Sequence, residues 1–146
     1  YLANQPANTL FESDGQGLTT HIESGTVFYR CVGGQSYRGE RCFGRPLVLD
    51  LPQTQSYLEE FSVKTQRDWR LPTQKEIRLI HLDQCQNPAV DTRVFPNLPI
   101  DNLWTGSQKM LQGDDFQCVM YTFNGSVSCR HFDSTPLPFL MVLDES

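Results

Sequence analysis

Four arginines lie close together in the first third of this 146-residue chain, and together they could bind an anion. Residues 30–45 contain one acidic residue, Glu40, which leaves the segment with a local charge of +3. The rest of the chain carries 8 basic and 16 acidic residues. Because guanidinium groups match the oxygens of carboxylate and sulfate groups, the cluster predicts an anion site. The alternative is four solvated or ion-paired surface groups. The arginines are Arg30, Arg38, Arg41 and Arg45.

Five cysteines, without a Cys-x-x-Cys motif of the kind that binds a metal, predict disulfide bonds and an oxidising compartment. Cys31 and Cys42 enclose a short glycine-rich loop that contains two of the arginines, and this spacing predicts that they bond to each other. In the chain-entropy model, closing a loop of this length stabilises a fold by about 2.5–3 kcal/mol.

The other three cysteines leave one thiol spare or bonded elsewhere. If Asn124-Gly125 forms a two-residue hairpin turn, Cys118 and Cys129 lie diagonally across the hairpin, about 7–8 Å apart. That separation exceeds the usual Cα distance across a disulfide, about 4.4–6.8 Å. We therefore expect Cys85 to bond to either Cys118 or Cys129, and the sequence leaves the choice between them open.

No combination of residues predicts catalysis or a metal site. The three histidines are scattered and lack metal-ligand spacing. Cys129 and His131 share a strand face, and we interpret them as a half-cystine beside an edge histidine rather than as a reactive or metal-binding pair. Asp114-Asp115, Asn97, Asp101 and Asn102 could offer oxygens to calcium, but we expect polar turn residues there. We therefore expect no enzymatic activity, no cofactor and no metal.

The clearest structural signal is the run from Trp69 to Ile77, Trp-Arg-Leu-Pro-Thr-Gln-Lys-Glu-Ile. Thr73 is suited to cap a helix N-terminus, and Glu76, three residues later, completes a capping box. Apolar residues follow on one side, so the pattern predicts a capped helix over residues 73–82.

Other segments predict one more helix and several short strands. We expect a helix over residues 53–64 and a long loop over residues 83–101. Trp69 and Trp104 could be platforms for sugar stacking, but we interpret both as core anchors. The expected strands cover residues 26–31, 47–51, 102–107, 116–123, 126–131 and 138–143, with Asn124-Gly125 as a hairpin turn.

Five motifs over residues 24–143 resemble the bacterial family named for the C-terminal domain of the Legionella collagen-like adhesin. The run Arg70-Leu71-Pro72-Thr73-x-x-Glu76 is also similar to formylglycine-generating enzymes, whose catalytic domain is a variant of the C-type lectin-like fold. The resemblance implies an α+β, C-type lectin-like fold with two short helices, a small antiparallel sheet, long loops and disulfides. The other motifs are Arg30-Cys31-x-x-Gly34-Gln35-x-x-x-Gly39-x-x-Cys42-x-Gly44, Val94-Phe95-Pro96-Asn97, Leu103-Trp104-Thr105-Gly106-Ser107 and Phe123-Asn124-Gly125.

Length and composition indicate one domain, since 146 residues can bury a substantial core. Residues 1–25 are polar and predict a lead-in segment before a domain over residues 26–146. The start at Tyr1 without a signal peptide predicts a mature or trimmed terminus. No apolar run approaches the ~18 residues that a membrane span needs. Together with the cysteines and the resemblance, these features imply a secreted or cell-surface bacterial protein.

The resemblance implies a non-enzymatic extracellular binding module of an adhesin or of a pilus or surface assembly. Its partner would be a glycan or a host or surface protein, bound through the arginine cluster. The founding adhesin's domain binds sulfated polysaccharides, whereas this chain carries a net charge of −5, which also argues against nucleic acid. The alternative is a structural subunit that contacts copies of itself or a filament partner and has no glycan site. A third class is an enzyme related to the formylglycine oxidases.

Overall fold

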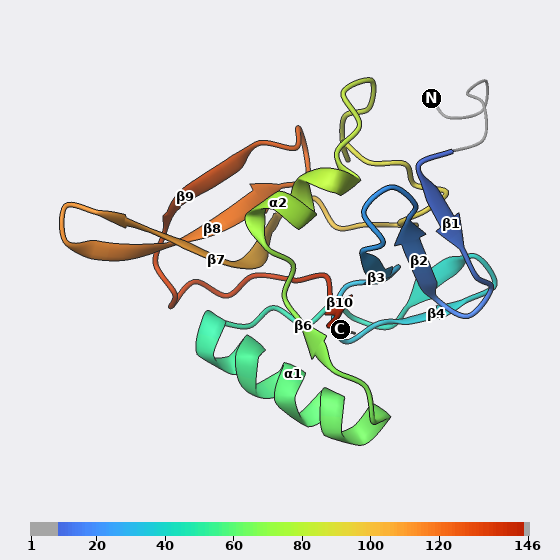
Figure 1. Ribbon diagram of the computed structural model, residues 1–146, viewed down its shortest axis with the longest axis horizontal. Coiled ribbons are helices and arrows are strands. Elements are labelled where there is room, and N and C mark those ends of the chain that lie inside the picture. Colours follow the sequence, from blue (N-terminus) through green and yellow to red (C-terminus); the bar gives the residue numbers. More distant parts are fainter. Residues whose placement is uncertain (1–8, 145–146) are drawn as a thin grey trace.

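Antiparallel strands form three sheets in the computed structural model, which describes residues 9–144 (Figure 1). The main sheet has the strand order β1-β2-β3-β10-β6. Strand β10, near the end of the chain, pairs with both β3 and β6, so distant parts of the sequence meet in one sheet. The strands are β1 (Phe11–Ser13), β2 (Leu18–His21), β3 (Val27–Tyr29), β6 (Trp69–Arg70) and β10 (Val142–Leu143).

Two further sheets are built from hairpins. The smaller contains β4 (Ser36–Arg38) and β5 (Arg41–Phe43). The larger contains β7 (Asn102–Leu111), β8 (Asp114–Tyr121) and β9 (Val127–His131), and Figure 1 shows the β7–β8 hairpin extending away from the rest of the molecule. With the two helices described below, these sheets confirm the predicted α+β fold class. No helix in the described residues is long and apolar enough to cross a membrane.

The longer helix, α1 (Leu51–Thr65), begins two residues before the predicted one because Asp50 caps it. The Asp50 carboxylate accepts a hydrogen bond from the Gln53 N–H at 2.8 Å, and the Gln53 side chain accepts one from the Asp50 N–H at 3.1 Å. The predicted strand over residues 47–51 is therefore wrong, and only Leu49 keeps an isolated β-bridge. A capping box thus replaces strand pairing at this point of the chain.

The second helix confirms the predicted capping box. Thr73 Oγ1 accepts a hydrogen bond from the Glu76 N–H at 3.1 Å, and Glu76 Oε1 accepts one from the Thr73 N–H at 2.9 Å. Arg70 also donates to both Glu76 carboxylate oxygens, at 2.7 and 2.9 Å. Hydrogen bonding to Arg70 lowers the pKa of Glu76, so this carboxylate is charged at neutral pH. The helix is shorter than predicted: α2 (Gln74–Ile77) continues only as a 3-10 turn, Arg78–Ile80.

Replacing Thr73 with alanine should destabilise the fold by about 0.5–2 kcal/mol, because the N–H of Glu76 loses its acceptor. The measurement is the free energy of unfolding in urea. Thr73→Ser is the matched control, since serine keeps the hydroxyl and should stay close to wild type. Equal stability of Thr73→Ala and wild type would contradict the proposed contribution of the cap.

The core consists of two clusters of buried apolar side chains, and both tryptophans belong to one of them. Trp104 has no exposed surface and donates its indole N–H to the Leu49 carbonyl oxygen at 2.8 Å. Trp69 is 9% exposed and donates to Thr65 Oγ1 at 3.0 Å. The assignment of both residues to the core is therefore confirmed, although Trp69 also lines a cavity that is described below.

The structure contains the predicted Cys31–Cys42 disulfide, but the prediction for Cys85 is wrong. Cys118 bonds to Cys129, with 3.8 Å between their Cα atoms, and Cys85 is a buried free thiol. The turn explains the error. It contains four residues, 122–125, because the Tyr121 N–H bonds to the Ser126 carbonyl oxygen. It pairs Met120 with Val127 and Val119 with Ser128, and this register places Cys118 directly opposite Cys129.

The predicted lead-in segment over residues 1–25 contributes to the main sheet in its described part. Residues 11–13 form β1 and residues 18–21 form β2, and β2 pairs with β3. Phe11 is 7% exposed and packs edge-on against Phe28 and Phe95. The boundary predicted at residue 26 therefore does not separate this segment from the domain. Residues 1–8 lie outside the described residues.

Candidate functional site

The β4–β5 hairpin presents the central part of the predicted arginine cluster. Arg38 lies directly opposite Arg41, and Gly39-Glu40 forms the two-residue turn between them. Both turn residues have positive φ, 54° and 65°, as a type I′ turn requires. The turn therefore places two arginines side by side at the tip of a short hairpin.

Besides hydrogen bonds of Tyr37 with Tyr29 and Arg30, two connections through Cys42 hold this hairpin against the rest of the fold. The Cys31–Cys42 disulfide links β5 to the segment that follows β3, with 5.6 Å between the Cα atoms. Asn97 makes two further bonds: its Oδ1 accepts from the Cys42 N–H at 2.9 Å, and its Nδ2 donates to the Cys42 carbonyl oxygen at 3.0 Å. The sequence placed Asn97 only in a loop motif and in an alternative calcium site. The structure gives it the role of fastening the hairpin.

Three of the four predicted ligand-binding arginines are exposed: Arg38, Arg41 and Arg45. None of them forms an ion pair with another described residue. The Arg38 guanidinium lies 4.6 Å from the centre of the Phe43 ring, which orients it without neutralising it. Because like charges directly opposite each other on a hairpin repel, an anion at Arg38 and Arg41 would relieve an unfavourable contact.

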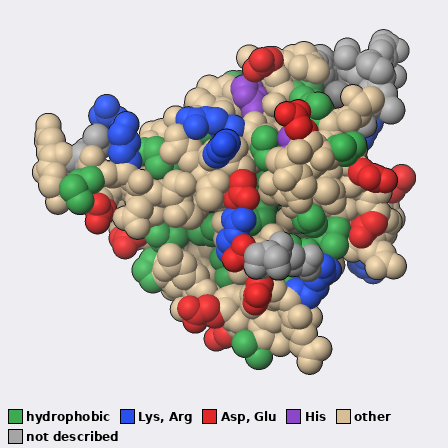
Figure 2. Space-filling model, viewed as in Figure 1, with side chains coloured by type: hydrophobic (Ala, Val, Ile, Leu, Met, Phe, Trp, Pro, Cys, Tyr) green, Lys and Arg blue, Asp and Glu red, His purple; other side chains and the backbone are tan. Residues whose placement is uncertain are grey.

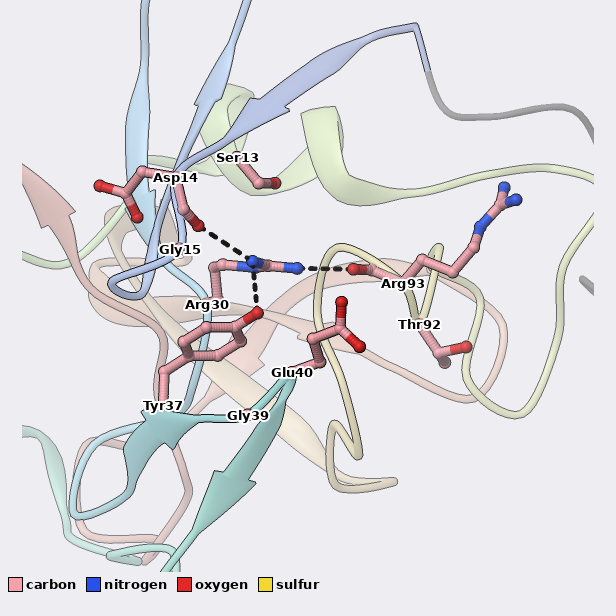
Figure 3. Close-up of a pocket in the computed structure, with 9 residues that line it drawn as sticks. All are labelled: Ser13, Asp14, Gly15, Arg30, Tyr37, Gly39, Glu40, Thr92 and Arg93. Carbon is pink, nitrogen blue, oxygen red and sulfur yellow. Dashed lines mark hydrogen bonds between the residues drawn. The ribbon is translucent and has the colours of Figure 1, made fainter.

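Arg30 has a different role from the one that the sequence predicts. It is only 7% exposed, and its guanidinium donates to the backbone oxygens of Val94 at 2.8 Å and Arg93 at 2.6 Å. Further bonds reach the Asp14 carbonyl oxygen and the Tyr37 hydroxyl (Figure 3). These partners use the donors that an anion would need. The prediction of Arg30 as a ligand-binding residue is therefore corrected: it joins the β1–β2 loop, β4 and the long loop.

A cavity of about 750 Å³ lies beside the Arg30 guanidinium. Figure 3 shows the Glu40 carboxylate near that guanidinium, whereas the Asp14 side chain points away and only its carbonyl oxygen meets Arg30. Because the Arg30 donors are already used and the Glu40 carboxylate lies nearby, the anion site that the sequence predicts is better placed on the exposed hairpin. Figure 2 shows acidic and basic side chains intermixed over the visible face, without a continuous basic surface.

The other candidate residues serve local structure. Asp101 Oδ1 accepts a hydrogen bond from the Asn102 N–H at 2.7 Å, and His21 Nδ1 lies 2.8 Å from the Ser24 hydroxyl. Among residues 9–144, no group of three or more His, Cys, Asp or Glu side chains is placed to hold a metal ion. Within residues 9–144, the arginine hairpin is therefore the strongest of the functional sites that the sequence predicts.

Comparison with known proteins gives one family. The family model of the Lcl C-terminal domain matches residues 14–142, which includes the arginine hairpin, the capped helix and the three-stranded sheet. No curated protein and no solved structure matches the chain, so the C-type lectin-like assignment stays a prediction. The match begins within the predicted lead-in segment, in agreement with the place of β2 in the main sheet. The chain belongs to the family of the Lcl C-terminal domain.

Proposed function

We propose that this domain is a non-enzymatic, extracytoplasmic binding module that recognises an anionic glycan through the β4–β5 hairpin. Membership of the Lcl family suggests a surface or adhesin-associated domain, and two disulfides are consistent with an extracytoplasmic location. The observation that carries the proposal is the pair Arg38 and Arg41, exposed and opposite each other on a hairpin fastened at its base.

The chemistry of this surface favours sulfate or carboxylate groups on an extended ligand. Each guanidinium presents several N–H donors in a fixed plane, and a rigid hairpin limits the entropy lost on binding. Because the domain as a whole is negatively charged, it attracts an anionic ligand only at the hairpin. This restriction favours a ligand whose anionic groups are spaced along its length. Because exposed charges are screened as the Debye length falls from ~8 Å to ~3 Å between physiological and 1 M salt, binding should weaken with salt.

The double variant Arg38→Ala/Arg41→Ala should bind a chondroitin sulfate hexasaccharide at least about tenfold more weakly than wild type. Loss of two charge-assisted hydrogen bonds exceeds the ~1.4 kcal/mol that corresponds to a factor of ten. The measurement is titration calorimetry at physiological salt, with and without a calcium chelator, which should change nothing. Lys109→Ala/Arg130→Ala is the matched control, since it removes the same charge from exposed positions on the larger sheet. Wild-type affinity in the folded Arg38/Arg41 variant would contradict the proposal.

A structural role in self-assembly is the second candidate, and the projecting β7–β8 hairpin favours it. Met110 is 68% exposed and Phe132 is 65% exposed, and the Phe132 ring lies 5.3 Å from that of Phe116. The exposed Phe132 ring and Phe116 form a small apolar patch of the kind that protein contacts use. The mass of the domain in solution, measured over a range of concentrations, distinguishes a self-associating subunit from a monomeric binding module.

A further inference from the structure

A cavity lined by aromatic rings lies at the base of the arginine hairpin. Its volume is about 330 Å³, and it is bounded by α1, by β2 and β3, and by the first residue of β4. Four rings line it in a continuous series: Tyr57 stacks on Phe61 with 5.6 Å between centres, Phe61 lies 5.7 Å from Trp69, and Trp69 lies 6.1 Å from Tyr29. Tyr29, Tyr57 and Phe61 are only partly buried, so part of their surface remains accessible.

Polar residues surround these rings. Four of them are uncharged and two are charged: Gln16, Gln35, Ser36 and Thr65, with Asp14 and Arg67. Burial raises the pKa of Tyr57, so its hydroxyl stays protonated at neutral pH. A cavity with aromatic rings and polar residues around them suits a ligand that has both apolar and hydroxyl-bearing surfaces.

Strand geometry connects this cavity to the arginines. Ser36 lines the cavity, and Arg38 is two residues further along β4, so both side chains project from the same face about 6.6 Å apart. Their partners on β5, Phe43 and Arg41, lie directly opposite and share that face. One continuous surface therefore runs from the aromatic cavity, past Ser36, to the paired arginines.

We propose that the aromatic cavity binds one pyranose ring of the same glycan whose anionic groups contact Arg38 and Arg41. The C–H groups on one face of a pyranose ring pack against aromatic faces, whose quadrupole is negative, and its hydroxyl groups meet the amides and hydroxyls of the walls. This inference rests on the proposed function and makes it specific: the ligand is a polysaccharide that the domain recognises both by a sugar ring and by its anionic groups.

The two indole N–H groups allow a direct test by NMR. Trp69 lines the cavity, whereas Trp104 is fully buried elsewhere and serves as the internal control. The probes are a chondroitin sulfate hexasaccharide and its desulfated, carboxyl-reduced form, which keeps the rings and carries no charge. We expect the charged probe to shift the Trp69 indole signal and the Arg38 and Arg41 amide signals. The uncharged probe should shift Trp69 at higher concentration, independently of salt.

The outcomes separate the two proposals. If the charged probe shifts the hairpin amides and leaves Trp69 unchanged, the aromatic cavity is not part of the site and the proposed function stands. If it shifts neither, both proposals are overturned. As a second measurement, Ser36→Leu should obstruct the cavity and weaken binding of the charged probe about tenfold. Ser36→Ala keeps the cavity open and should weaken that binding less than about threefold. Equal affinities of Ser36→Leu and wild type would overturn the role of the cavity.

Discussion

Replacing Cys31 and Cys42 together with serine should lower the free energy of unfolding by about 2.5–3 kcal/mol and also weaken glycan binding. The loss of stability arises because the unfolded chain regains the conformational entropy that is lost when the disulfide closes a loop between cysteines 11 residues apart. The loss of binding arises because β5 loses its covalent link, and the hairpin is then held by hydrogen bonds alone, those of Asn97 with Cys42 and those of Tyr37 with Tyr29 and Arg30. A more mobile hairpin has to be ordered when the ligand binds, which costs affinity.

The second disulfide supplies a matched control. Cys118 and Cys129 are also 11 residues apart, so the chain-entropy model gives their removal nearly the same effect on stability. They lie in the larger sheet, away from β4 and β5, so Cys118→Ser/Cys129→Ser should leave the affinity of the folded protein unchanged. The measurements are equilibrium unfolding in urea and calorimetric titration below the unfolding transition. A Cys31/Cys42 variant that binds the hexasaccharide like wild type would show that the disulfide does not support the site.

Local signals in the sequence predicted those parts of the fold that depend on neighbouring residues. The capping box of Thr73 and Glu76 needs only residues three positions apart, and the structure reproduces both of its hydrogen bonds. The Cys31–Cys42 bond spans a short loop, so its spacing alone indicated the pairing. The same reasoning missed Asp50 and Gln53, which form an equivalent box, because the apolar run before them also fits a strand.

Features that depend on tertiary contacts were not predictable in this way. The four-residue turn over residues 122–125 sets the register that places Cys118 opposite Cys129, whereas the local signal Asn124-Gly125 favours a two-residue turn. Arg30 carries the same charge as Arg38, but its partners are 64 and 63 residues away in the chain, at Val94 and Arg93. The aromatic cavity likewise combines α1, β3 and β6, so its residues form no recognisable motif. Only two of the sequence-predicted arginines therefore form the centre of the candidate site.

Gly33→Ala should destabilise the domain by about 1–3 kcal/mol, because the new methyl group would overlap the ring of Phe139. Phe139 has no exposed surface and packs edge-on against Tyr57 at 5.5 Å, so its ring has little room to move. Gly33 cannot easily move away either: its N–H donates to the Phe139 carbonyl oxygen, and its own carbonyl oxygen accepts from the Leu47 N–H, both at 2.9 Å.

The matched control is Gly15→Ala, since a Cβ at Gly15 would meet nothing within 4 Å. Alanine there should leave stability unchanged or raise it slightly by reducing the freedom of the unfolded chain. The measurement is the midpoint of thermal unfolding, where a loss of 1 kcal/mol corresponds to a shift of about 2–4 °C at this size. Any displacement of Phe139 would also move Tyr57, which lines the aromatic cavity. Gly33→Ala should therefore also weaken binding of the hexasaccharide. Equal midpoints for the two glycine variants would show that the core beneath the hairpin adapts to the added methyl group.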